Sequence, residues 1–169
     1  MSEVSAQEPD WTRETPARWW DPARKLVRTM RAYQSARSPL GRRWAVLRHR
    51  FWSVVTGAEL PLTLQADGGL ILPHPHGVTI HPEVRMGPNC MIFQQVTLGT
   101  NRGRDGVPVL GGHVDVGPGA RVLGPVTIGD HAVIGANAVV LQDVPAGAMA
   151  VGVPARILPA PGQSEGDKA

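Results

Sequence analysis

The chain has 169 residues and a mass of 18.1 kDa, which is the size of one domain and enough to bury a core without disulfide bonds. Its 20 glycines and 16 prolines exclude a helix bundle, because each of them weakens a helix interior. A single cysteine excludes an internal disulfide, and neither a secretory leader nor an apolar run of membrane-spanning length is present, so we expect a cytoplasmic protein.

The formal net charge of +3 is unevenly distributed along the chain. Residues 1–52 contain all five tryptophans and balance at +6, whereas residues 53–169 contain 19 of the 20 glycines and balance at −3. A basic, tryptophan-bearing stretch most often packs against a neighbouring subunit or domain. A weak association with an anionic membrane surface through these basic residues stays open.

The first third of the chain predicts a short helical region. Residues 1–20 are polar with scattered prolines, and we expect them to be disordered. Asp21 followed by Pro22 is typical of a helix start, and Ser38-Pro39 ends that segment. A second helix is expected from Leu40 to about residue 55, so that residues 21–56 form a helical N-terminal region.

From Val78 onward the sequence repeats every six residues. Ten of the twelve residues at six-residue steps from Val78 to Val144 are aliphatic, Ala or Cys, and eleven of the twelve from Ile80 to Ala146 are apolar. A hexapeptide repeat indicates an all-β fold, the parallel β-helix, in which each hexad is one short strand and a corner. We expect about four to five coils of 18 residues in a domain of residues 57–158, followed by a disordered tail of residues 159–169.

Two interruptions of the period predict features on the surface. Between Gly99 and Val107, Arg102 and Arg104 occupy positions that should be buried, which predicts a projecting loop. Earlier, eight residues instead of six separate Leu72 from Ile80, so two extra residues must bulge outward in the Pro-His-Pro-His-Gly segment 73–77.

The bulge holds the strongest candidate for chemistry. His74, between two prolines and outside the core, is a candidate general base at neutral pH, the alternative being a solvated corner residue. Glu59 lies fifteen residues earlier, a little under one coil, so stacking could place its carboxylate beneath His74 and fix the imidazole tautomer. On spacing alone Glu59 could equally be a surface charge.

Other histidines and the cysteine suggest different roles. His113 and His131 are 18 residues apart and should stack on successive coils, and His76 and His81 have an HxxxxH spacing. A trimeric β-helix can share three zinc-binding histidines across an interface, as in the γ-class carbonic anhydrases, but no third ligand is evident here. Cys90 occupies a core position of the repeat and should serve packing.

Three runs of sequence resemble a known family. The runs GLILPHPHGVTIHPEVRMGPNCMIFQQVTLGT, GGHVDVGPGARVLGPVTIGDHAVIGANAVVLQDVP and VGVPARIL are similar, in this order, to serine O-acetyltransferases and to their capsule or polysaccharide relatives among the hexapeptide-repeat acyltransferases. The resemblance spans about residues 53–158. It implies a left-handed β-helix, a homotrimer with active sites between subunits, and acetyl-CoA as co-substrate. We expect no metal.

Carried over by position, the resemblance assigns roles to individual residues. The catalytic histidine of the family corresponds to His74, and its acidic partner corresponds to Glu59, where Glu replaces the Asp of the family. The groove for the pantetheine arm of CoA would run past four further residues. These are Thr97, Gly99, Pro118 and Ala136.

We therefore expect an acetyl-CoA-dependent O-acetyltransferase that acts on a small hydroxyl acceptor and does not bind nucleic acid. The acceptor stays open between L-serine, a sugar hydroxyl and another small metabolite, because Pro73 and Gly106-Val107 replace the Asp and the Arg-His pair with which serine acetyltransferases hold serine. Two alternatives from other classes remain: a zinc hydratase of the γ-carbonic-anhydrase type, and a non-catalytic β-helix that scaffolds partners.

Overall fold

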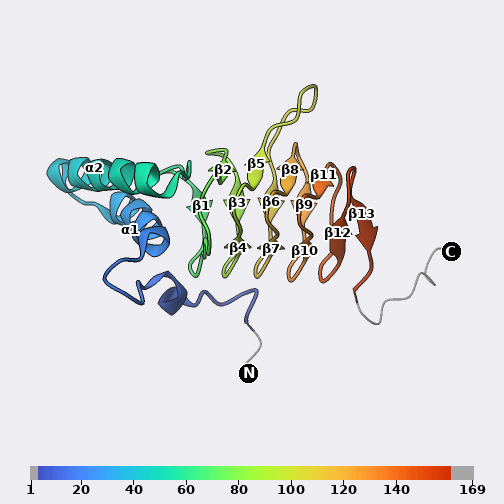
Figure 1. Ribbon diagram of the computed structural model, residues 1–169, viewed down its shortest axis with the longest axis horizontal. Coiled ribbons are helices and arrows are strands. Elements are labelled where there is room, and N and C mark those ends of the chain that lie inside the picture. Colours follow the sequence, from blue (N-terminus) through green and yellow to red (C-terminus); the bar gives the residue numbers. More distant parts are fainter. Residues whose placement is uncertain (1–3, 161–169) are drawn as a thin grey trace.

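A computed structural model describes residues 4–160 (Figure 1). It has a short 3₁₀ helix η1 (Trp11–Glu14), two helices α1 (Pro22–Ser35) and α2 (Pro39–Thr56), and a coiled stack of short strands that extends away from them. No helix in the described range is both long and apolar enough to cross a membrane.

Both helices begin where a capping side chain precedes a proline. The Asp21 carboxylate accepts a hydrogen bond from the Arg24 N–H, and the Ser38 hydroxyl accepts one from the Gly41 N–H, while a proline occupies the first turn of each helix. Helix α2 ends at Gly57, whose φ of 62° places it in the left-handed region that favours glycine. The local sequence therefore determines these helix ends.

Three sheets form the faces of the β-helix, and each takes one strand from successive coils. Their orders are β1-β3-β6-β9, β4-β7-β10-β12-β13 and β2-β5-β8-β11, and every pair is parallel except β12–β13. The strands are β1 (Gln65–Ala66), β2 (Thr79–Ile80), β3 (Arg85–Met86), β4 (Met91–Ile92), β5 (Thr97–Gly99), β6 (Val109–Leu110), β7 (Asp115–Val116), β8 (Arg121–Leu123), β9 (Thr127–Ile128), β10 (Val133–Ile134), β11 (Val139–Val140), β12 (Met149–Val151) and β13 (Arg156–Leu158).

The strand register confirms both predicted interruptions. A regular coil has 18 residues, as in the pairing of Val109 with Thr127. The coil from Gln65 to Arg85 has 20 residues, because it contains the two-residue bulge. The coil from Arg85 to Val109 has 24, because it contains six extra residues in a loop that projects from the stack between β5 and β6 (Figure 1). Arg102 and Arg104 are exposed in this loop.

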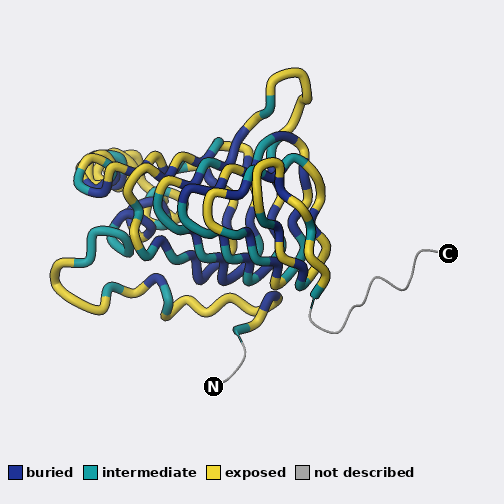
Figure 2. The backbone as a smooth tube through the Cα atoms, turned by 45° about the vertical axis from the view of Figure 1, so that its right-hand side comes forward, coloured by how far each residue is buried: buried dark blue, intermediate teal, exposed yellow. Residues whose placement is uncertain are grey.

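The inward positions predicted from the repeat are buried, except that the prediction for Ala146 is wrong. The six-residue steps predict that Ala146 faces the core, but Ala146 is exposed, and Ala148 and Ala150 are buried instead. The pairing of Val133 with Met149 makes this last coil 16 residues long, two short of the regular repeat. The period therefore breaks a third time before the stack ends. Burial follows the inside of the coil throughout (Figure 2), and Leu26 and Met30 of α1 belong to the same apolar core.

Residues 4–20 pack along the β-helix, in place of the disorder that we expected for residues 1–20. The buried side chain of Asn89 holds this segment: its amide donates to the carbonyl oxygens of Ser5 and Glu8 at 2.7 and 2.8 Å, and its oxygen accepts from the Asp10 N–H at 2.9 Å. These contacts join residues about 80 positions apart, so no local pattern reveals them. Residues 1–3, and residues 161–169 of the predicted tail, lie outside the described range.

Candidate active site

The bulge at residues 73–77 presents His74 on the surface. The His74 side chain is exposed, whereas the flanking Pro73 and Pro75 are half-buried, and the Val78 N–H donates to the Pro75 carbonyl at 3.2 Å to close the turn. Each proline fixes φ on one side of the histidine. The bulge therefore holds an accessible imidazole outside the apolar core on a braced backbone.

A cleft of about 480 Å³ separates the bulge from the start of α1. Residues 73–76 line one side, residues 17–18 and 20–24 line the other, and Val55 and Thr56 at the end of α2 complete it. It is open to solvent and has room for a small polar molecule beside His74.

The α1 side of the cleft carries an ion pair. The Asp21 carboxylate lies 3.1 Å from the Arg24 guanidinium and also accepts from the backbone N–H of Ala17. Burial raises the pKa of Asp21, but the hydrogen bonds from Arg24 and from the backbone outweigh that effect, so the pKa lies below its ordinary value. A charged carboxylate and a guanidinium thus face the histidines of the bulge.

The second histidine of the bulge, His76, is exposed like His74 but lies beside the end of α2. His76 packs over Gly57, where an added Cβ would come within 3.0 Å of its Nδ1 atom. The Gly77 N–H donates to the Gly57 carbonyl at 2.9 Å, which ties this end of the bulge to the end of α2. The exposed His76 ring therefore lies between the end of α2 and the cleft, which it also lines.

The bulge lies at the start of one stacked corner of the β-helix. The Gln95 N–H donates to the His76 carbonyl, the Gly119 N–H to that of Gln94, and the Asn137 N–H to that of Pro118, each at 2.8 Å. Three of the four residues predicted to line the CoA groove lie on or beside this corner. They are Thr97, two residues after Gln95, then Pro118, and Ala136, which precedes Asn137.

Gly99 lies farther away, at the other end of β5. Its carbonyl accepts from the Gly124 N–H at 2.8 Å, next to the projecting loop. The structure thus aligns His74, Thr97, Pro118 and Ala136 with one edge of the stack and puts Gly99 beyond it.

Glu59 lies on the coil before His74 but pairs with a different residue. It is exposed and in register with Thr79, with the Glu59 N–H donating to the Val78 carbonyl at 2.8 Å. Thr79 is five residues beyond His74, because the bulge lengthens this coil. No hydrogen bond joins Glu59 to His74 within residues 4–160.

The two histidines expected to stack do so. The Nδ1 atoms of His113 and His131 are 2.9 Å apart on successive coils, and their rings meet edge to face. Such a bond requires one protonated and one bare nitrogen. Among the residues that the structure describes, no three His, Cys, Asp or Glu side chains gather as a metal site would require.

Sequence reasoning missed the polar residues that the helical region contributes to the cleft. Asp21 was identified only as a helix cap, and Arg24 was not singled out, although both line the cleft. The Oε1 atom of Gln94 at the stacked corner was also missed: it is buried and has no hydrogen-bond partner in the described part of the chain. Nothing in the local sequence signals either feature, because each depends on the packing of distant segments.

Comparison with known proteins supports the resemblance in sequence. Residues 108–142 match the family model described as "Bacterial transferase hexapeptide (six repeats)". The chain is 42% identical over 106 residues to a serine acetyltransferase of Helicobacter pylori (strain J99), covering 62% of each protein. It is 37% identical over 117 residues to one of Mycobacterium tuberculosis, covering 68% of this chain and 50% of the relative. The chain thus spans 50% to 62% of the length of these relatives.

Solved structures agree with this relationship. A serine acetyltransferase from Brucella abortus superposes with a TM-score of 0.71 at 28% identity, covering 81% of this chain and 56% of that one. Soybean serine acetyltransferase complexed with serine superposes with a TM-score of 0.66 at 31% identity, covering 80% of this chain and 55% of the soybean chain. The left-handed β-helix is confirmed. On these matches, the chain is similar in sequence and in fold to serine acetyltransferases and carries their type of hexapeptide repeat.

Proposed function

We propose that this chain is an acetyl-CoA-dependent O-acetyltransferase that acts on the hydroxyl group of a small acceptor. One observation carries the proposal: the exposed, proline-braced His74 lines a cleft at the start of a continuous β-helix corner, in a chain related to serine acetyltransferases. Acceptor and donor would meet at that point.

His74 is the proposed general base. It removes the proton of the acceptor hydroxyl while the oxygen attacks the thioester carbonyl of acetyl-CoA. The C–S bond then breaks, and the leaving CoA thiolate takes that proton back from His74. General-base assistance of this kind typically contributes about 10²- to 10⁴-fold in rate. Holding donor and acceptor together at the cleft supplies further acceleration.

Glu59 is the proposed positioning residue for His74. Its carboxylate lies on the preceding coil, and the pairing with Thr79 leaves its side chain exposed on the outer surface. A carboxylate that accepts from one imidazole nitrogen keeps the other nitrogen bare for proton removal and stabilises the imidazolium that forms. This role requires the exposed His74 ring to turn toward the coil of Glu59.

The stacked corner is the proposed binding site for the donor. The pantetheine arm of acetyl-CoA would lie along Thr97, Pro118 and Ala136, with Gly99 farther along β5. The unpartnered, buried Oε1 of Gln94 suits an amide N–H of that arm, because a buried acceptor without a donor is costly. The chain's own residues therefore offer a chemical fit for an amide-bearing cofactor at this edge.

The cleft is the proposed acceptor site. Its Asp21–Arg24 pair and its two histidines suit a polar molecule, and L-serine is the first candidate because the relatives are named for it. A sugar hydroxyl is the alternative, since Pro73 and Gly106-Val107 cannot make the ionic contacts of the Asp and Arg-His pair that they replace. A homotrimer would place the exposed corner of one subunit against its neighbour.

The test is CoA release from acetyl-CoA with a panel of L-serine, homoserine, nucleotide sugars and oligosaccharides. We expect activity with one acceptor class and a fall in kcat of about 10²- to 10⁴-fold in His74→Ala. His76→Ala is the matched control from the same bulge and should retain much more activity. Glu59→Gln should lower kcat with little change in KM. Wild-type activity in His74→Ala would refute the mechanism, and failure to bind acetyl-CoA would refute the function.

A further inference from the structure

We propose that the outer face of helix α2 binds an anionic lipid surface. The inference is independent of the proposed function and arises from a row of apolar side chains on this helix that face solvent. Their exposed fractions lie between 55% and 85%, values unusual for large apolar residues in such number. The row consists of Leu40, Trp44, Leu47, Phe51 and Val54.

These residues form one stripe along the helix. Their spacings of four, three, four and three residues repeat every two turns, so the side chains project from a single face. Ala45, His49 and Trp52 are the residues of α2 buried against the rest of the molecule, and they lie on a different face. The exposed stripe is therefore not the packing face of α2, and nothing in residues 4–160 covers it.

The charged residues of α2 that border the stripe are all arginines. Arg43 and Arg50, two turns apart, border one side of the stripe, and Arg48 borders the other; all three are exposed. Helix α2 contains no aspartate or glutamate. An apolar face with tryptophan and phenylalanine, bordered by arginines, is the arrangement with which helices lie in the interface of an anionic bilayer.

Aromatic side chains before α1 extend this surface. The Trp20 ring packs edge-on against Trp52 with centroids 5.6 Å apart, and Phe51 of the stripe packs against the same ring at 4.9 Å. Trp19 is 83% exposed, and the Lys25 ammonium lies over its ring at 5.6 Å. Tryptophan and lysine are both residues of the interfacial zone, so the surface continues past the end of α2.

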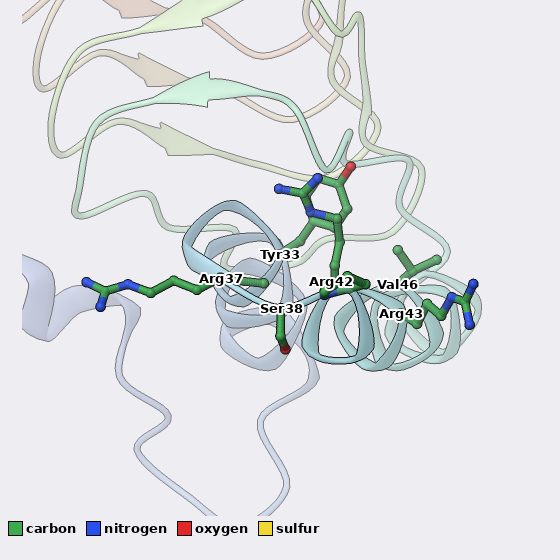
Figure 3. Close-up of a pocket in the computed structure, with 8 residues that line it drawn as sticks. Tyr33, Arg37, Ser38, Arg42, Arg43 and Val46 are labelled. Atoms are coloured by element: carbon green, nitrogen blue, oxygen red, sulfur yellow. The ribbon is translucent and has the colours of Figure 1, made fainter.

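A basic pocket opens where α1 turns into α2, on the side of α2 that carries Arg42 and Val46 and not on the apolar stripe (Figure 3). It has a volume of about 550 Å³ and is lined by the aliphatic and aromatic parts of Tyr33 and Val46 together with three arginines, Arg37, Arg42 and Arg43. The Arg42 guanidinium stacks over the Tyr33 ring at 5.3 Å. The Arg37 and Arg43 side chains point to opposite sides in Figure 3, so the pocket does not gather the three charges around one phosphate, and the proposal rests on the stripe and its flanking arginines.

Charge favours a lipid surface over a second copy of this helix. Two α2 helices packed stripe to stripe would bring six flanking arginines together without an acidic residue of α2 to compensate. An anionic bilayer supplies both the apolar depth and the opposite charge. The helix has 18 residues, about 27 Å along its axis, so all of its turns can lie in the plane of the interface.

Vesicle co-sedimentation of the full chain tests the proposal. The vesicles are phosphatidylcholine alone and phosphatidylcholine with phosphatidylglycerol, each at low and high salt. We expect binding to the anionic vesicles that weakens with salt, together with a blue shift of tryptophan emission that is smaller in Trp44→Phe. Arg43→Gln with Arg50→Gln should weaken binding roughly fivefold for each arginine removed. Leu47→Ser with Phe51→Ser should abolish it.

The matched control is Arg85→Gln with Arg156→Gln, which removes the same charge from exposed positions of the β-helix. It should bind as the unchanged protein does, and circular dichroism should show that every variant is folded. Absence of binding to anionic vesicles would overturn the proposal, as would equal weakening by the control. A loss of oligomer size in the Leu47/Phe51 variant without vesicle binding by the unchanged protein would assign the stripe to an interface between copies.

Discussion

The ion pair between Glu14 and Arg31 should be the main electrostatic contact that holds residues 4–20 in place. Glu14 is 5% exposed, and its carboxylate accepts from Arg31 at 2.8 and 3.1 Å and from the Leu70 N–H at 3.1 Å. Arg31 also donates to the carbonyl oxygens of Ala66 and Asp67. One pair therefore joins η1, α1 and the first coils of the β-helix.

Removal of the carboxylate should be costly. Breaking a buried ion pair from one side typically costs about 3–5 kcal/mol of unfolding free energy. For Glu14→Ala we expect a loss at the lower end of this range, because Arg31 is partly exposed and keeps two carbonyl acceptors. For a chain of this length, about 3 kcal/mol lowers the melting temperature by about 6–12 °C. Glu14→Gln should cost less, about 1–2 kcal/mol, since an amide oxygen can still accept from the Leu70 N–H.

The assay is thermal and urea unfolding of the unchanged protein, Glu14→Ala, Glu14→Gln, Arg31→Met and the Glu14/Arg31 double variant. The double variant should be more stable than the sum of the single losses predicts, because no unpaired charge then remains. The reasoning is refuted if Glu14→Ala melts with the unchanged protein, or if the two losses simply add.

Two further predictions concern buried groups. Burial raises the pKa of the Cys90 thiol to about 11, and its Sγ lies 3.2 Å from the Gly111 carbonyl, so a thiol reagent should label the native protein far more slowly than the urea-unfolded chain; rapid native labelling would contradict this. Burial lowers the pKa of His49 below 6.5, the value for an unperturbed histidine, while its Nε2 donates to the Leu60 carbonyl at 2.7 Å. Just below pH 6.5 only the unfolded chain therefore binds a proton at this histidine, so the free energy of unfolding should decrease as the pH falls below that value. In urea unfolding, His49→Gln should show a shallower decrease with pH. An unaltered pH dependence in this variant would exclude His49 as the source.

Much of the fold can be predicted from the sequence because each hexad is a local structural unit. An inward side chain every sixth residue must be apolar wherever the coil is regular, and the burial of Val78, Val96 and Val114 confirms this. The same reasoning locates irregularities, since extra residues can only project outward. The bulge at residues 73–77 and the loop after β5 were both predicted in this way.

The candidate site was predictable only in part. His74 was identified because it lies on an interruption of the period, and its exposure agrees with that interpretation. Its role and that of Glu59 stay predictions. The 20-residue coil places Glu59 beside Thr79, and a spacing of fifteen residues does not reveal that register. Residues 17–18 and 20–24, which form the other side of the cleft, carried no catalytic pattern at all.

The sequence by itself determined the helix ends, the hexapeptide coil and the position of the bulge, because caps, prolines and side-chain periodicity act between neighbours in the chain. Only the tertiary structure decided the path of residues 4–20 along Asn89, the cleft beside α1, and the exposure of the apolar stripe of α2 within residues 4–160. The physical reason is the same in each case. Contacts between residues that are tens of positions apart depend on how complete elements pack, and no local pattern encodes that arrangement.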